Sequence, residues 1–114
     1  MCITIYHNTR WGKSRKTLQL LRDNGHEPTV IEYLKNPPNE KELRKICKIL
    51  DLTPIDIIRK TEKEYKELNI SNYDTGKDII EKMVRHPRLI ERPIVIKGEN
   101  GIIGRPPENV LKLI

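Results

Sequence analysis

The stretch from Tyr6 to Arg15 is the part of the sequence whose residue types suit the binding of a small anion. It follows a short β-prone run, Cys2–His7, and is a polar loop expected to open a helix. A loop between a parallel strand and a helix presents backbone N–H groups and the positive end of the helix dipole. Such a place suits an oxyanion, and it also lowers the pKa of a thiol. This loop contains no cysteine.

The two cysteines of the chain lie elsewhere. Cys2 begins the β-prone run, and a rise of about 3.3 Å per residue places it roughly 15 Å from the loop. Cys47 falls on the apolar side of a later predicted helix, where a buried, inert thiol is expected. The pair forms no CxxC motif, so the sequence predicts no disulfide framework and no cysteine metal site. We expect no bound metal or cofactor.

The elements that position the loop form a βαβ unit. Ser14 is the expected N-cap of a helix that ends at Asn24-Gly25. The inner face of this helix carries Thr17, Leu18 and Leu21. Thr29–Leu34 is a second β-branched run, and the helix lies between the two runs. The strands are therefore expected to pair in parallel through a right-handed crossover.

The middle of the chain predicts helices. Asn39 is the expected cap of a helix with Leu43, Ile46, Cys47 and Leu50 at helical spacing. Thr53-Pro54 opens a short helix that carries Ile55, Ile57 and Ile58. The segment from Tyr65 to Asn72 shows no clear pattern for a helix, a strand or a loop. The positions of Ile79, Ile80, Met83 and Val84 indicate a further helix that ends before Pro87.

The end of the chain predicts a hairpin and a last helix. Pro93–Ile96 and Ile102–Ile103 flank a turn, and Glu108–Ile114 follows two prolines. The order βαβ, several helices, ββα predicts an α/β fold with a thioredoxin-like (glutaredoxin-like) core and a helical insertion. With 114 residues, we expect one domain over residues 1–114.

The composition and the start of the sequence limit the classes of function that we expect. Met1 to Tyr6 does not start a secretory signal, and no run is long enough to cross a membrane, so we expect a cytoplasmic monomer without membrane partners. The net charge of +6 invites a nucleic-acid interpretation. The basic residues mostly alternate with acidic ones, as on solvated helix faces, and no aromatic RNA-stacking motif is present. We expect no nucleic-acid partner.

Several motifs, spread over nearly the whole chain, resemble the ArsC family of glutaredoxin-dependent arsenate reductases. They follow the family's order without large gaps. They are Ile3–Asn8, Gly12–Leu18, Tyr33–Pro38, Ile58–Lys60, His86–Val95 and Gly104–Pro106. The resemblance implies an ArsC-type thioredoxin-like fold. It also implies that Pro93 is the cis-proline which faces the active loop in such folds.

The resemblance also implies a mechanism and a set of site residues. In the family a cysteine attacks arsenate, glutathione displaces the adduct, and glutaredoxin completes reduction to arsenite. Three arginines hold the oxyanion, and by position they correspond to Arg59, Arg92 and Arg105. His7 matches the residue that helps to keep the cysteine ionised. The loop and helix start contribute Asn8, Gly12, Ser14 and Arg15.

Trp11 stands where the family has its cysteine. An indole donates one hydrogen bond but cannot attack arsenic or transfer two electrons as a thiolate does. We therefore expect a family member with an oxyanion-binding arginine pocket and without thiol-based arsenate reduction. One alternative is an active reductase, with glutathione and glutaredoxin as co-substrates, that works by an unforeseen route. Another is a redox-silent protein-binding module, similar to the Spx-type transcription regulators.

Overall fold

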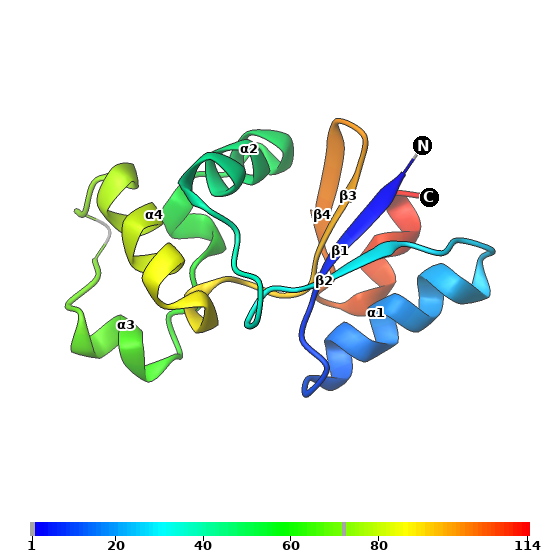
Figure 1. Ribbon diagram of the computed structural model, residues 1–114, viewed down its shortest axis with the longest axis horizontal. Helices are drawn as coiled ribbons and strands as arrows, with labels where there is room; N and C mark the ends of the chain where they lie inside the picture. The colour runs from blue at the N-terminus through cyan, green and yellow to red at the C-terminus, as the bar shows by residue number, and fades with distance from the viewer. Residues whose placement is uncertain (1, 72) are drawn as a thin grey trace. The chain divides into compact units, whose positions relative to one another are not determined.

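The computed structural model describes residues 2–71 and 73–114, so Met1 and Asn72 lie outside the described residues (Figure 1). These residues form two compact units, which we call the sheet unit and the helical unit. The sheet unit holds the described residues up to Asn36 together with Arg92–Ile114, and the helical unit holds Pro37–Glu91. The order βαβ, helices, ββα and the α/β class are confirmed.

The sheet unit has four strands in the order β2-β1-β3-β4. Its elements are β1 (Ile3–His7), α1 (Gly12–Asp23), β2 (Thr29–Glu32), β3 (Ile94–Lys97), β4 (Asn100–Ile103) and the 3₁₀ helix η3 (Pro107–Lys112). β1 and β2 are parallel, with Ile5 opposite Val30, which confirms the predicted parallel pairing. β3 runs antiparallel to both β1 and β4.

The core of the sheet unit lies on the face of the sheet that α1 and η3 cover together (Figure 1). Burial alternates along β1, so that Ile3, Ile5 and His7 point into this core. The other buried apolar members are Leu18, Leu21, Val95 and Val110. The predicted inner face of α1 is confirmed, since Thr17, Leu18 and Leu21 are all buried.

The helical unit comprises α2 (Glu40–Leu50), η1 (Pro54–Ile57), α3 (Lys63–Glu67), α4 (Gly76–Arg85) and η2 (Pro87–Leu89). α2 packs against α4, and the buried residues of the two helices are Leu43, Ile46, Cys47, Ile79, Ile80 and Met83. The predicted cap is confirmed, because the Asn39 side chain accepts a hydrogen bond from the Glu42 N–H at 2.8 Å. No helix in the described part of the chain is both long and apolar enough to cross a membrane.

Two predicted helices are 3₁₀ helices instead. Thr53-Pro54 opens η1, which ends at Ile57, and the last helix spans Pro107–Lys112 and not Glu108–Ile114. Prolines stand at the start of both segments, and runs this short favour the tighter i→i+3 pattern. The segment that fitted no single state contains the second half of α3.

Gly104 fixes a close approach between β4, α1 and Pro93. Its N–H donates to the Pro93 carbonyl at 2.9 Å. A Cβ placed on it would lie 2.7 Å from Thr17 Oγ1 and 2.8 Å from Pro93 Cγ. Both distances are shorter than real contacts of a Cβ, so the chain can pass here only without a side chain.

Gly104→Ala is therefore expected to lower the free energy of unfolding by about 1–3 kcal/mol, the usual cost of overpacking. Urea denaturation followed by circular dichroism measures this. Gly12→Ala is the matched control, because its Cβ would meet only the far end of Arg15 at 3.7 Å. Equal denaturation midpoints for both variants would show that the contact relaxes at no cost.

Candidate functional site

The loop between β1 and α1 is held by hydrogen bonds of its own residues. The Asn8 side chain accepts from the Arg10 N–H at 3.0 Å, and the Asn8 carbonyl accepts from the Trp11 N–H at 3.2 Å. The Arg15 guanidinium donates to the Thr9 carbonyl at 2.8 Å. Because several bonds close the loop on itself, the backbone of Trp11 has a defined position at the start of α1.

The predicted cap of this helix is wrong. α1 begins at Gly12, and its N-cap residue is Trp11, not Ser14. The Ser14 hydroxyl is buried, lies 2.6 Å from His7 Nδ1, and accepts a hydrogen bond from the Asn8 N–H at 3.0 Å. It therefore joins the helix to the strand end and the loop, a tertiary role that its neighbours in sequence do not reveal.

Trp11 and Arg92 meet in a cation–π contact. The guanidinium carbon of Arg92 lies 3.7 Å from the indole ring centroid, well inside the distance at which such pairs attract. Arg92 is only 3% exposed, whereas Trp11 is 45% exposed. The contact joins two predicted site residues: Trp11, at the position that the resemblance assigns to a cysteine, and Arg92, which is predicted to hold the anion. Their types alone did not predict that they touch.

Arg92 and Arg105 both belong to the sheet unit, and each precedes a cis-proline. The cis bond before Pro93 confirms the prediction made from the resemblance. Arg105 follows Gly104 at the end of β4 and is exposed. Its backbone N–H donates to the Ile103 carbonyl at 2.9 Å, and its own carbonyl accepts from the Asn109 side chain at 3.1 Å. The backbone that carries the Arg105 side chain is thus fixed.

Arg59 belongs to the helical unit, where two carboxylates contact it. Its Nε lies 3.4 Å from Glu62 Oε1, and its Nη1 lies 3.2 Å from Glu91 Oε1. The side chain is only 10% exposed, so these ion pairs are less screened than surface pairs. Within this unit, Arg59 is an ion-pair partner, and its predicted role in holding an oxyanion stays a prediction.

From the loop to Arg22 of α1, all the aliphatic charged side chains are positive. Residues 1–22 contain five arginines and lysines and no aspartate or glutamate. The first turn of α1 holds no acidic residue, and Arg10, Lys13 and Arg15 are exposed. A helix start with this composition attracts anions through its backbone dipole and its side chains together.

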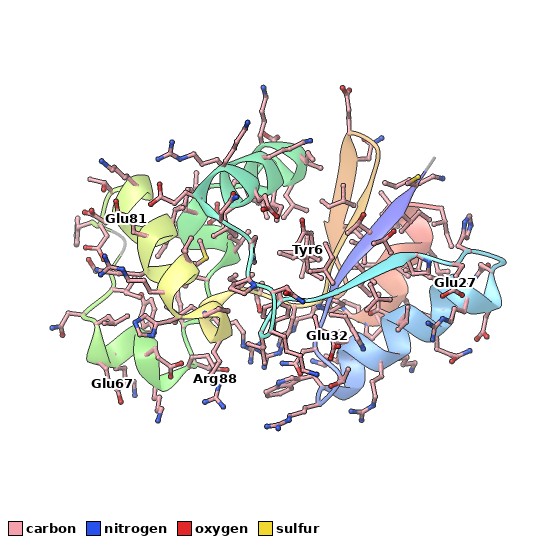
Figure 2. All side chains as sticks on the ribbon, viewed as in Figure 1. Tyr6, Glu27, Glu32, Glu67, Glu81 and Arg88 are labelled. Carbon is pink, nitrogen blue, oxygen red and sulfur yellow. The ribbon has the colours of Figure 1, made fainter. Side chains whose placement is uncertain are left out.

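His7 is buried at the end of β1, and burial lowers its pKa because it penalises the charged ring. The carboxylate of Glu32, which lies opposite in β2 (labelled in Figure 2), opposes this and raises the pKa. The cations Arg22 and Arg15 lower it further. The structure thus favours a neutral His7 imidazole that is hydrogen-bonded to the Ser14 hydroxyl.

Since the pKa of His7 is lower in the folded chain, the folded state binds this proton less readily than the unfolded chain. The contribution of His7 to stability is complete above the unfolded pKa of about 6.5 and falls as the pH drops toward the folded pKa. Urea denaturation across this pH range should show that the free energy of unfolding falls as the pH drops in wild type, and that it falls less steeply in His7→Gln. His26→Gln serves as the control for removing one imidazole. An unchanged slope in His7→Gln would contradict the assignment.

Both cysteines lie outside the loop between β1 and α1. Cys2 is exposed and precedes β1, whereas Trp11 lies beyond the opposite end of that strand. Cys47 is buried in α2 of the helical unit, where burial raises the pKa of its thiol and the carboxylate of Asp56 raises it further. A thiol with a raised pKa is a poor nucleophile near neutral pH.

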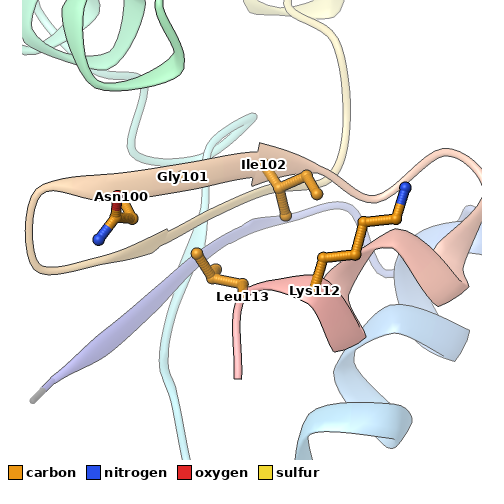
Figure 3. Close-up of a pocket in the computed structure, with 5 residues that line it drawn as sticks. All are labelled: Asn100, Gly101, Ile102, Lys112 and Leu113. Atoms are coloured by element: carbon orange, nitrogen blue, oxygen red, sulfur yellow. The ribbon is translucent and has the colours of Figure 1, made fainter.

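The sheet unit also has a hollow of about 280 Å³ between β4 and the end of the chain (Figure 3). Its lining consists of Asn100, Gly101, Ile102, Lys112 and Leu113. None of these is a predicted site residue. Among the described residues, no group of three or more histidines, cysteines or acids is arranged to hold a metal ion.

Comparison with known proteins gives four consistent matches. Residues 6–113 match the model of the ArsC family. The uncharacterized protein YfgD of Escherichia coli strain K12 is 44% identical over 114 residues, which cover 98% of this chain and 96% of that protein. An arsenate reductase of Haemophilus influenzae is 40% identical over 116 residues, and the match covers 100% of this chain and 100% of that protein. The solved structure of an arsenate reductase from Vibrio cholerae has a TM-score of 0.96 and 40% identity, and covers 100% of this chain and 98% of its own.

Proposed function

This chain belongs to the ArsC family, and we propose that it is an oxyanion-binding member which does not reduce arsenate through a thiol. The observation that carries the proposal is the position of Trp11 at the N-cap of α1, stacked on Arg92. The family resemblance assigns the nucleophilic cysteine to this position. Here an aromatic ring occupies it.

The loss of reduction follows from electron counting. Arsenate becomes arsenite by accepting two electrons, and in the family thiols supply them as they become disulfides. An indole has no sulfur to form the bond to arsenic or the disulfide. Cys47 has a raised pKa, and Cys2 lies at the far end of β1. Glutathione and glutaredoxin therefore have no thiol at this site to act on.

Anion binding survives the change, because the groups that attract an anion do not include the cysteine. The Arg92 guanidinium can donate parallel, charge-assisted hydrogen bonds to an oxyanion from its edge. The exposed cations of the loop and the start of α1 add to the positive field. Arsenate and phosphate share charge and shape, so we propose a tetrahedral oxyanion of either kind.

The experiment that tests this combines turnover with binding. Wild-type protein given arsenate, glutathione and glutaredoxin should consume reductant no faster with arsenate than without it. Phosphate should nevertheless bind in titration calorimetry at low salt, where charge interactions are least screened. Arsenate-dependent turnover would overturn the proposal, and Cys2→Ser and Cys47→Ser would then identify the thiol responsible.

A further inference from the structure

Trp11 and Arg92 offer two different kinds of surface to a ligand. A guanidinium is planar: it stacks through its face and donates hydrogen bonds from its edge. The indole lies against the face, at 3.7 Å from the ring centroid to the guanidinium carbon. Stacking on the face and in-plane hydrogen bonding from the edge use different parts of the guanidinium, so the two contacts do not exclude each other.

The indole is also accessible beside this guanidinium. It is 45% exposed although Arg92 is almost completely buried. An exposed tryptophan offers a large apolar surface with a polarisable ring, which favours contact with another flat apolar group. An inorganic oxyanion has no atoms that can use this surface, whereas an organic group on the oxyanion can cover it.

We propose that the site selects oxyanions that carry a planar organic group, and that Trp11 is the residue that determines this selectivity. The proposal rests on the proposed function, since it requires that Arg92 holds the oxyanion. The negative group of the ligand binds the guanidinium edge within the positive field of Arg10, Lys13 and the start of α1. The planar group of the ligand lies against the indole.

Aryl and alkyl phosphate monoesters separate the two contributions. Phenyl phosphate and methyl phosphate carry similar charge and the same three terminal oxygens, but only the first has a ring. Aromatic pairs contribute about 0.5–1.5 kcal/mol beyond burial of area, and 1.4 kcal/mol is tenfold in affinity. Wild-type protein should therefore bind phenyl phosphate about 2- to 10-fold more tightly than methyl phosphate.

Calorimetric titration of both esters and of inorganic phosphate, at one low salt concentration, measures this ratio of dissociation constants. Trp11→Leu should bring the ratio close to one, because leucine keeps apolar bulk without a flat ring. Trp11→Phe should restore most of the ratio. Arg44→Ala, which removes an exposed arginine of α2, is the charge control and should leave the wild-type ratio. Circular dichroism confirms that each variant is folded.

The outcomes distinguish the two proposals. If phosphate binds and Arg92→Ala weakens its binding, but phenyl and methyl phosphate bind equally, the selectivity is wrong and the proposed function stands. A ratio that persists in Trp11→Leu overturns the role of Trp11 as well. If phosphate does not bind, or Arg92→Ala has no effect on its binding, the proposed function itself fails.

Discussion

Trp11→Cys is expected to start glutathione- and glutaredoxin-dependent arsenate reduction, at a rate at least about 100-fold above the wild-type background. Loss of a nucleophile can cost an enzyme about a millionfold in kcat, so even a poorly adapted pocket leaves room for a gain of this size. The variant supplies the bond-forming sulfur where the family resemblance assigns it. Coupled oxidation of the reduced glutaredoxin system, with and without arsenate, measures the rate.

The surroundings of position 11 are suited to a thiolate. The side chain leaves the N-cap of α1, at the positive end of the helix, in a stretch without acidic residues. Both features lower the pKa of a thiol and raise the thiolate fraction near neutral pH. The closed hydrogen bonds of the loop hold the backbone in place, and His7 and Ser14 lie beneath it.

Trp11→Ser is the matched control for this gain. It removes the indole as Trp11→Cys does, but it adds oxygen in place of sulfur and should stay at background. Activity in both variants would mean that removing the ring merely exposes another thiol. Silence of Trp11→Cys, together with intact phosphate binding, would mean that the pocket has changed further than this one residue.

Arg92→Ala has the second largest expected effect, a loss of phosphate affinity of about 10- to 100-fold. Hydrogen bonds to charged groups contribute about 1.5–3 kcal/mol, and the fork of a guanidinium provides two of them to one oxyanion. Arg92→Lys should recover only part of the affinity, because an ammonium keeps the charge but not the planar fork. Titration calorimetry at low salt measures all three proteins.

Arg44→Ala removes the same charge from an exposed position on α2 and should bind phosphate as wild type does. Arg59→Ala and Arg105→Ala, titrated in the same way, give the shares of the two other arginines that the resemblance implies. Equal phosphate affinity in Arg92→Ala and wild type would show that the Arg92 guanidinium does not bind the anion. Anion binding by the sheet unit would then have to come from Arg105 and the cations of the loop and α1.

Much of the fold could be predicted because its signals are local. The cap at Asn39, the buried side of α1 and the end of α4 before Pro87 each depend on residues within a few turns of one another. Parallel pairing of β1 and β2 followed from the helix between them. The resemblance predicted the cis bond before Pro93, which no local pattern indicates.

The errors and omissions arise from tertiary contacts. Ser14 has the right type and place for a cap, but His7 and Asn8 use its hydroxyl. Trp11 and Arg92 lie far apart in sequence, so their stacking follows only from the pairing of β1 with β3. One of the two carboxylates that contact Arg59 belongs to Glu91, which is also distant in sequence. Such contacts decide what a candidate site residue does, and composition and spacing do not show them.

Trp11 is the only tryptophan of the chain, and it lies against the guanidinium proposed to bind the anion. All indole fluorescence of the protein therefore originates at this place. A nearby positive charge shifts and quenches indole emission, so any change in the neighbourhood of Arg92 alters the spectrum directly. Trp11 is therefore an intrinsic optical probe of this position, and no label has to be attached.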